Sequence, residues 1–291
     1  MFPKVRDYHK PNKPLVSNGL GVIYVLVSAT YLFLLYWFEL AENEASNNVS
    51  SVLTLAVCIL FGGFMGLLDD WMDLRWRHKA FFPLIAAIPL ISLAYWLGLR
   101  TSITTPIFGA IDFGVYYYFI IIPLIVTVAT NTVNQLGGLN GLETICPAIM
   151  IVGMMAISGS NVILLYVPLI AWLLLAFLNF QGKIFVGNTG SFAIGMTLAA
   201  FAIISDLKSS LLISLSPYIF NSALILLSYF FFKTRASVSF DGEKLVSDHR
   251  RSLITLITYR RALSERQVVV IISLLVAVST FAALIFQWLL L

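Results

Sequence analysis

Two adjacent aspartates, Asp69 and Asp70, have the residue type and position that most clearly suggest chemistry. They follow the apolar run 51–68, and Asp73 comes soon enough for all three carboxylates to share one face if the helix continues. Like charges this close repel unless a cation or a positive partner lies among them. A membrane anchor does not need an acidic pair. We therefore interpret Asp69 and Asp70 as functional and the nearby Arg75 and Arg77 as anchors.

Three asparagines in the motif NTVNQLGGLNGLE form a second candidate constellation. Asn131 and Asn134 share a helical face at the end of an apolar run, and Asn140 follows within a glycine-rich turn. A helix end with a glycine turn would explain the glycines but not three amides, which are costly at the edge of an apolar segment unless they are bonded. Carboxylate and amide oxygens together suit Mg²⁺, with Mn²⁺ as an alternative.

A polar turn, GNTGS, forms the third constellation and spans residues 187–191. Gly187 and Asn188 lie where a backbone could approach a ligand closely, and Ser191 is expected to cap the helix that follows. The N-terminus of that helix would attract a phosphate group through its free amides and its dipole. Ordinary turn chemistry explains the same residues equally well.

A basic loop, residues 233–266, is the fourth constellation. His249 and Arg250 could grip a pyrophosphate through charge-assisted hydrogen bonds. Basic residues near anionic lipid headgroups are also common in membrane proteins. We favour phosphate binding for His249 and Arg250 and interpret Arg260 and Arg261 as lipid or structural contacts.

The elements that must position these groups are apolar helices. Of the 291 residues, 59% are hydrophobic and 11% are charged, whereas soluble proteins are about 25% charged. The composition predicts an all-α, polytopic integral membrane protein, with residues 1–291 as one transmembrane catalytic domain in the lipid bilayer. About nine spans are expected, with ten as the alternative, at about 19–39, 51–68, 80–98, 114–133, 143–159, 161–179, 192–206, 210–232 and 267–290.

The connections between these spans differ sharply in charge. Segments 1–18, 69–79, 134–142, 180–191 and 233–266 carry every Lys and Arg except Arg100 and Lys208. The positive-inside rule therefore predicts that these segments are cytoplasmic. The four constellations all fall on this side, which predicts a cytoplasmic site for a soluble phosphorylated substrate beside an apolar wall for a lipid. Nucleic acid is not an expected partner, because the basic residues are spread among loops between spans.

A transporter for an anionic metabolite or a lipid-linked sugar is the alternative from another functional class. Such a protein would carry polar groups near the middle of its spans. The central parts of the expected spans hold almost no ionisable residues, which favours an enzyme.

The order of the four motifs resembles that of the polyprenyl-phosphate N-acetylhexosamine-1-phosphate transferases, a glycosyltransferase family 4 type. The matching segments are LLDDWMDLRWRHK, NTVNQLGGLNGLE, GNTGSFAIG and DHRR. LRWRHK and NGLE look most similar to the eukaryotic and archaeal branch, which uses UDP-N-acetylglucosamine and dolichyl phosphate. Family members typically have ten spans, so this chain would lack the first.

The resemblance implies a role for each matching residue. Asp69 and Asp70 would be the catalytic pair, and Asn134 and Asn188 would bind the metal. Asn188 stands where the family usually has Asp, which removes a negative charge from the metal site. The implied substrate-binding residues are Lys79, Asn131, Asn140, Gly187, His249 and Arg250, with Asn140 at the uracil and Lys79 at the pyrophosphate.

The implied reaction transfers GlcNAc-1-phosphate from UDP-GlcNAc to dolichyl or another polyprenyl phosphate and releases UMP, with Mg²⁺ as cofactor. It would be the first membrane step of lipid-linked glycan assembly, for protein N-glycosylation or a cell-envelope polysaccharide. The expected location is an archaeal cell membrane, or the endoplasmic reticulum membrane if the chain is eukaryotic. Another UDP-sugar, the length of the polyprenol and a homodimeric state are all left open.

Overall fold

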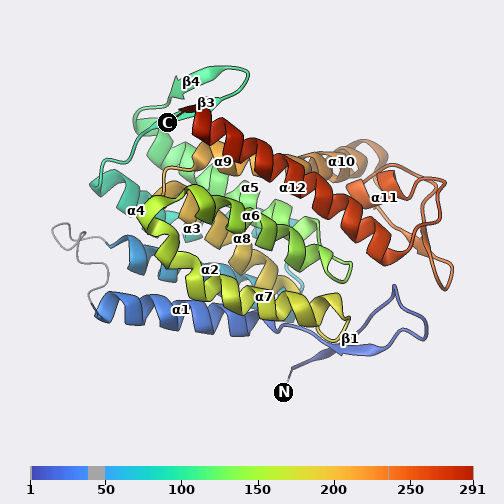
Figure 1. The fold of residues 1–291 in the computed structure, drawn as a ribbon. Coiled ribbons are helices and arrows are strands. Elements are labelled where there is room, and N and C mark those ends of the chain that lie inside the picture. Colours follow the sequence, from blue (N-terminus) through green and yellow to red (C-terminus); the bar gives the residue numbers. More distant parts are fainter. Residues whose placement is uncertain (1, 39–49, 235, 291) are drawn as a thin grey trace.

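The computed structural model describes residues 2–38, 50–234 and 236–290 as a bundle of apolar helices with three short hairpins (Figure 1). Position 39 of the first expected span and position 235 of the basic loop lie outside the described residues. The helices of the first half are α1 (Gly21–Trp37), α2 (Ser51–Met72), α3 (Trp76–Ala86), α4 (Ile88–Trp96), the π-helix η2 (Tyr117–Ile121), α5 (Ile122–Gln135) and α6 (Leu142–Ile157).

The second half of the chain completes the bundle. Its helices are the 3₁₀-helix η3 (Gly159–Leu165), α7 (Tyr166–Phe180), α8 (Gly187–Ile204), α9 (Lys208–Ser214), α10 (Ser216–Phe232), α11 (Leu253–Ile257) and α12 (Glu265–Leu290). The antiparallel hairpins pair β1 (Lys4–Arg6) with β2 (Leu15–Ser17), β3 (Ser102–Thr105) with β4 (Gly109–Asp112), and β5 (Ser239–Phe240) with β6 (Leu245–Val246).

Each of the nine expected spans coincides with helix in the described residues, but length and hydropathy support fewer membrane crossings. Six helices qualify, or seven if the pair α9–α10, bent by 56°, counts as one span. Helices α1 and α6 are shorter, with 17 and 16 residues. The chain is therefore mostly helical and polytopic, and the count of nine spans stays a prediction.

Helix α8 is the centre of the bundle, and it packs against α1, α2, α5 and α6. Residues 189–203 of α8 are all buried. Glycine makes the closest contacts possible: a Cβ on Gly66 of α2 would lie 2.2 Å from the carbonyl oxygen of Asn188, and one on Gly21 of α1 would lie 2.2 Å from Gly190 Cα. Small residues thus allow three helices to meet at the start of α8.

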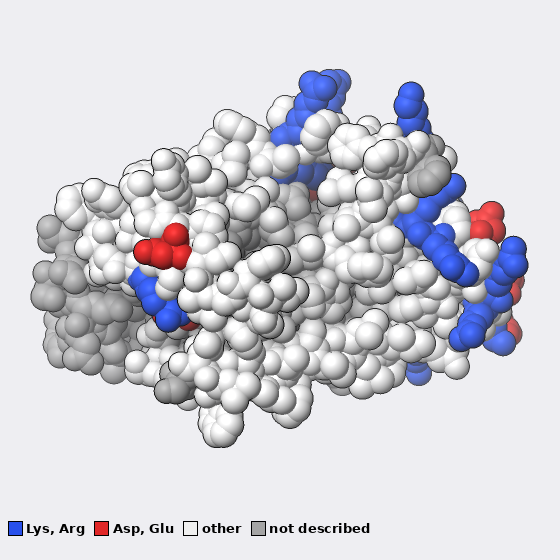
Figure 2. Space-filling model, turned by 90° about the horizontal axis from the view of Figure 1, so that it is seen from above, with Lys and Arg blue, Asp and Glu red and all other residues white. Residues whose placement is uncertain are grey.

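The two ends of the bundle carry different loops. Hairpin β1–β2 and the loop that holds α11 lie at the same end, on the right in Figure 1, whereas hairpin β3–β4 lies at the other. We call these the α11 end and the β3–β4 end. Figure 2 shows most of the visible Lys and Arg atoms toward one end, with a broad uncharged middle. An uncharged middle is what a lipid-facing surface requires.

Candidate active site

Asp70, near the end of α2, binds the first turn of α8. Its Oδ1 accepts a hydrogen bond from the Asn188 backbone N–H at 2.9 Å, and its Oδ2 accepts from the Thr189 N–H at 2.9 Å and the Thr189 hydroxyl at 2.7 Å. A carboxylate at a helix N-terminus satisfies free amides and complements the helix dipole. The prediction that Ser191 caps this helix is wrong, because Asp70 from another helix supplies the cap and Ser191 lies within the helix.

Gly187 allows this contact. It begins α8 with φ +71°, and a Cβ at this position would lie 2.8 Å from Asp70 Oδ2 and 3.0 Å from Asn18 Oδ1. A side chain would therefore push the carboxylate away from the start of the helix, and the positive φ favours glycine independently.

Asp69 is buried and has different partners from its neighbour. Its Oδ1 accepts from the Leu74 N–H at 2.9 Å, and its Oδ2 lies 2.8 Å from Lys79 Nζ. Helix α2 ends at Met72, and Asp73 takes a left-handed conformation with φ 48°. The predicted face of three helical carboxylates is therefore wrong for Asp73, because the chain turns there and brings Lys79 back to Asp69.

The two asparagines of α5 also differ in their contacts. Asn131 Nδ2 donates to the backbone oxygens of Lys79, at 3.1 Å, and Thr127, at 2.9 Å. It thus fastens the segment that holds Lys79, and it does not line the cavity that contains Asn134. The side-chain amide of Asn134 makes no hydrogen bond within the part of the chain that the structure describes, so both its polar atoms are open to a ligand.

A cavity of about 280 Å³ at the α11 end, here called the polar cavity, contains four of the predicted residues. They are Asp70, Asn134, Gly187 and Asn188. The sequence interpretation missed the other polar residues of its wall. The full lining is Val5, Arg6, Asp7, Tyr8, His9, Asn18, Asp70, Asn134, Gly137, Gly138, Glu143, Phe185, Gly187 and Asn188.

The donor groups of the polar cavity fit a divalent cation. The Asn188 side chain, like that of Asn134, has no hydrogen-bond partner among the described residues, so two amide oxygens are free. Asp70 and Glu143 add carboxylates. Oxygen groups of this kind suit Mg²⁺. No cluster of three or more His, Cys, Asp or Glu side chains suited to a metal occurs within the described ranges, so the amides would have to contribute.

Asn140 lies behind the wall of this cavity. Its Nδ2 donates to Asp7 Oδ2 at 2.7 Å and to Glu265 Oε1 at 3.0 Å, and its backbone N–H donates to the same Glu265 oxygen at 2.7 Å. Lys10 completes the group with an ion pair to Glu265 of 3.0 Å. Asn140 Oδ1 is buried and has no hydrogen-bond partner within the described chain. Asp7 links this group to the polar cavity, since it also belongs to the cavity wall.

A second cavity, here called the amphipathic cavity, has a volume of about 830 Å³ and contains Lys79. One side is charged and the other is apolar, with aromatic and aliphatic side chains of α10. The lining is Asp73, Leu74, Arg75, Trp76, Arg77, Lys79, Gln135, Ile225, Leu226, Tyr229 and Phe230. The Asp69–Lys79 ion pair thus connects α2 with this second cavity.

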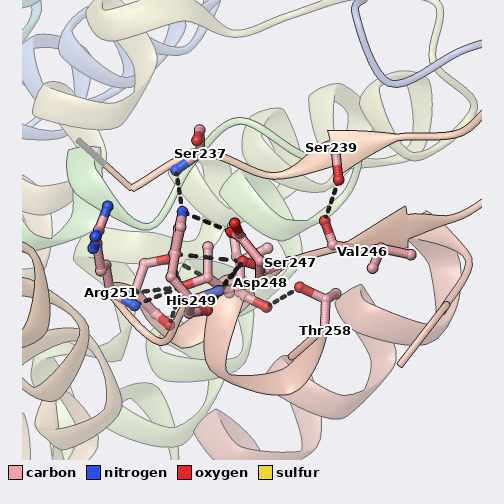
Figure 3. A network of polar contacts seen from close by, with 11 residues as sticks. Ser237, Ser239, Val246, Ser247, Asp248, His249, Arg251 and Thr258 are labelled. Carbon is pink, nitrogen blue, oxygen red and sulfur yellow. Dashed lines mark hydrogen bonds and ion pairs between the residues drawn. The ribbon is translucent and has the colours of Figure 1, made fainter. Parts of the chain in front are cut away.

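His249 and Arg250 lie in neither cavity lining. Figure 3 shows His249 within the basic loop, where its Nε2 accepts from the Ser237 N–H at 3.4 Å. The Arg250 guanidinium stacks 4.1 Å from the centre of the Tyr259 ring. Their predicted substrate contacts therefore stay a prediction. In the same loop, the exposed Asp241 side chain accepts hydrogen bonds from the backbone N–H groups of Lys244 and Glu243. These bonds, with the larger effect from Lys244, lower the pKa of Asp241 below its usual value.

Comparison with known proteins identifies the family. The sequence profile described as Glycosyl transferase family 4 matches residues 52–206, which is more than half of the chain. A Saccharolobus solfataricus protein is 32% identical over 97% of this chain and 87% of its own length. It is provisionally named UDP-N-acetylglucosamine–dolichyl-phosphate N-acetylglucosaminephosphotransferase.

Two further relatives are more distant. The Saccharomyces cerevisiae UDP-N-acetylglucosamine–dolichyl-phosphate N-acetylglucosaminephosphotransferase is 26% identical over 74% of this chain and 59% of its own length. The phospho-N-acetylmuramoyl-pentapeptide-transferase of Bacillus cytotoxicus is 28% identical over 78% of this chain and 72% of its own.

The helical bundle and the matched profile define a multi-pass membrane enzyme. The chain belongs to glycosyl transferase family 4, as a member of the polyprenyl-phosphate N-acetylhexosamine-1-phosphate transferases.

Proposed function

We propose that this protein transfers GlcNAc-1-phosphate from UDP-GlcNAc to dolichyl phosphate or another polyprenyl phosphate and releases UMP. The names of the Saccharolobus and yeast relatives support this choice of sugar and lipid. The match to the Bacillus protein makes another UDP-sugar the alternative. The excess of Lys and Arg in the loops of the α11 end supports a cytoplasmic site.

The observation that carries the proposal is that Asp70 lines the polar cavity while its neighbour Asp69, which is buried, pairs with a lysine of the amphipathic cavity. Asp70 belongs to the wall of the polar cavity, which offers oxygen ligands for a cation, and its carboxylate accepts from the Asn188 and Thr189 N–H groups at the start of α8. Asp69 holds Lys79, which lines the amphipathic cavity. A reaction between a soluble sugar nucleotide and a lipid phosphate needs two such compartments meeting at one point.

Each cavity suits one substrate. In the amphipathic cavity, Lys79, Arg75 and Arg77 would attract the lipid phosphate, while Tyr229 and Phe230 on α10 offer apolar surface to the polyprenyl chain. In the polar cavity, Asn134 and Asn188 would hold Mg²⁺, which when bound neutralises the charge of the diphosphate.

The chain's own residues would mainly position the two substrates and balance the negative charge of their phosphate groups. An oxygen of the lipid phosphate attacks the phosphorus bonded to the sugar, and a new pyrophosphate bond forms. The bond from that phosphorus to the oxygen that bridges to UMP breaks, and UMP leaves with the electrons of this bond. Lys79, fixed by Asp69 and by the Asn131 contact to its backbone, would hold the acceptor phosphate beside Asp70. Asp70 would orient that phosphate, and a covalent aspartyl-phosphate is the alternative route.

The test is UMP release by the purified chain with polyprenyl phosphate, Mg²⁺ and a panel of UDP-sugars. We expect release with UDP-GlcNAc, more of it from Asn188→Asp and almost none from Asp70→Asn. A burst of UMP without lipid acceptor would favour the covalent route. No UMP from either the wild type or Asn188→Asp with any UDP-sugar would contradict the proposal, and release only with UDP-MurNAc-pentapeptide would contradict the choice of sugar.

A further inference from the structure

Glu143, in the first turn of α6, is a carboxylate of the polar cavity to which the reaction above assigns no role. The Ser191 hydroxyl donates a hydrogen bond to its Oε1, and the same hydroxyl lies 3.1 Å from the carbonyl oxygen of Gly187. Gly187 directly precedes Asn188. The carboxylate of Glu143 is therefore tied, through one serine, to the first turn of α8, where Asn188 stands.

Glu143 is also adjacent to the other candidate ligand. A Cβ on Gly137 would lie 3.7 Å from the Cδ of Glu143 and 3.4 Å from the backbone oxygen of Asn134. The carboxylate thus packs beside the turn that follows α5, next to the helix end that bears Asn134. Glu143 thus shares the wall of the polar cavity with both asparagines of the candidate cation site.

The other two acids of the cavity wall are more heavily committed. Both oxygens of Asp70 accept hydrogen bonds from the start of α8. Both oxygens of Asp7 are also used, since Oδ1 accepts from the His9 N–H at 3.1 Å and Oδ2 accepts from Asn140. Glu143 accepts a single hydrogen bond, through Oε1, and its Oε2 has no partner among the residues that the structure describes. Glu143 is therefore the carboxylate of this wall with the most capacity for a ligand.

Two amides alone form a weak site for Mg²⁺, because amide oxygens carry no net charge and this cation favours carboxylates. We infer that Glu143 supplies the carboxylate that Asn188 lacks, and that it completes a cation site with Asn134 and Asn188. This inference rests on the proposed Mg²⁺-dependent reaction. The competing explanation is structural: Glu143 only pins Ser191 and thereby the start of α8.

Mn²⁺ binding to the purified full chain separates these explanations, with free Mn²⁺ measured by electron paramagnetic resonance. We expect Glu143→Gln to weaken Mn²⁺ binding by about 10- to 100-fold. Adding Asn188→Asp to that variant should restore affinity to within about threefold of the wild type, because it returns the missing charge. Ser191→Ala is the matched control: it removes the hydrogen bond but keeps the carboxylate, and should stay within about threefold.

Three results would overturn the inference: unchanged Mn²⁺ affinity in Glu143→Gln, an equal loss in Ser191→Ala that Asn188→Asp does not restore, or binding only by variants that contain Asn188→Asp. Failure of the proposed function is read separately, from UMP release with UDP-GlcNAc. A wild type that binds Mn²⁺ through Glu143 but releases no UMP would contradict the proposed reaction and still support the cation site.

Discussion

The two ends of the bundle differ in how their polar and charged side chains are used. At the β3–β4 end, Asp206 accepts from Arg100 at 3.0 Å and from Lys208 at 2.8 Å. Lys208 is 1% exposed, donates to the Arg100 carbonyl oxygen and lies 4.6 Å from the centre of the Tyr117 ring. The charges here satisfy one another.

At the α11 end, ion pairs also occur, as in Asp69–Lys79, but further polar side chains line a cavity without a protein partner. The amides of Asn134 and Asn188 have no hydrogen-bond partner in the described chain, and Glu143 uses one oxygen of two. Side chains that line a cavity without a protein hydrogen-bond partner are available to a ligand. The number of charged residues at an end therefore says less about function than the number of polar atoms there that have no hydrogen-bond partner in the protein. The following variants test this contrast, from the largest expected effect to the smallest.

Asp70→Asn should give the largest loss. The amide carries no charge and turns an N–H₂ group toward the donors at the start of α8, so we expect kcat for UMP release to fall about 10³-fold. Asp241→Asn is the matched control, because the same change is made in an exposed turn of the basic loop. Retention of more than about a tenth of the activity by a folded Asp70→Asn protein would contradict a catalytic role.

Asp206→Asn should damage stability without damaging the reaction. It leaves Lys208 buried without its carboxylate. Because the Asp206 side chain is itself 47% exposed, solvent screens the pair, and we expect a cost of about 2 kcal/mol and a melting temperature lower by a few degrees. Lys208→Met should cost much less, because an apolar side chain of similar size replaces a buried ion. Loss of kcat/KM in well-folded Asp206→Asn would mean that the β3–β4 end takes part in function.

The Asp69–Lys79 pair at the α11 end should behave as a coupled unit. Asp69→Asn and Lys79→Met each leave a charge without its partner, whereas the double variant leaves neither. The double variant should therefore melt at a higher temperature than the sum of the single losses predicts, with a coupling of about 2 kcal/mol. Additive losses would mean that the two side chains do not interact in the folded protein.

Asp7→Asn should have the smallest effect of the four. It weakens the hydrogen bond that Asp7 accepts from the Asn140 amide, the group implied at the uracil. We therefore expect UDP to bind about tenfold more weakly, a loss of about 1.4 kcal/mol. Isothermal titration with UDP measures this change, with Asp241→Asn again as control. Equal UDP affinity in the wild type and Asp7→Asn would mean that Asp7 and the N-terminal hairpin do not contribute to nucleotide binding.

The sequence could predict which loop residues converge, because each lies at the end of an apolar run on the side rich in Lys and Arg. Asp70, Asn134, Gly187 and Asn188 share one cavity for this reason. The positions of Asp73 and Ser191 were wrongly predicted from local helix rules. The chain turns after Met72, and Asp70 from a distant helix caps α8, which are tertiary effects that local patterns do not contain.

Two acids of the cavity wall were missed for different reasons. Asp7 reaches the cavity because the N-terminal hairpin pairs with the segment before α8, where Ser17 bridges to Ile184, and no periodicity in residues 1–18 signals that. Glu143 has a signal in the sequence, since it ends the asparagine motif at the start of an apolar helix, but an acidic residue is also common in the first turn of a helix. His249 and Arg250 remain predictions, because the structure gives them contacts within their own loop.

The most direct test is an experimental structure of the wild-type chain with UDP-GlcNAc and Mn²⁺. We expect the diphosphate and the cation in the polar cavity, bordered by Asp70, Asn134 and Asn188. A sugar nucleotide bound instead between the N-terminal hairpin and Phe240, where a separate cavity of about 820 Å³ lies, or at the β3–β4 end, would contradict the assignment of the active site.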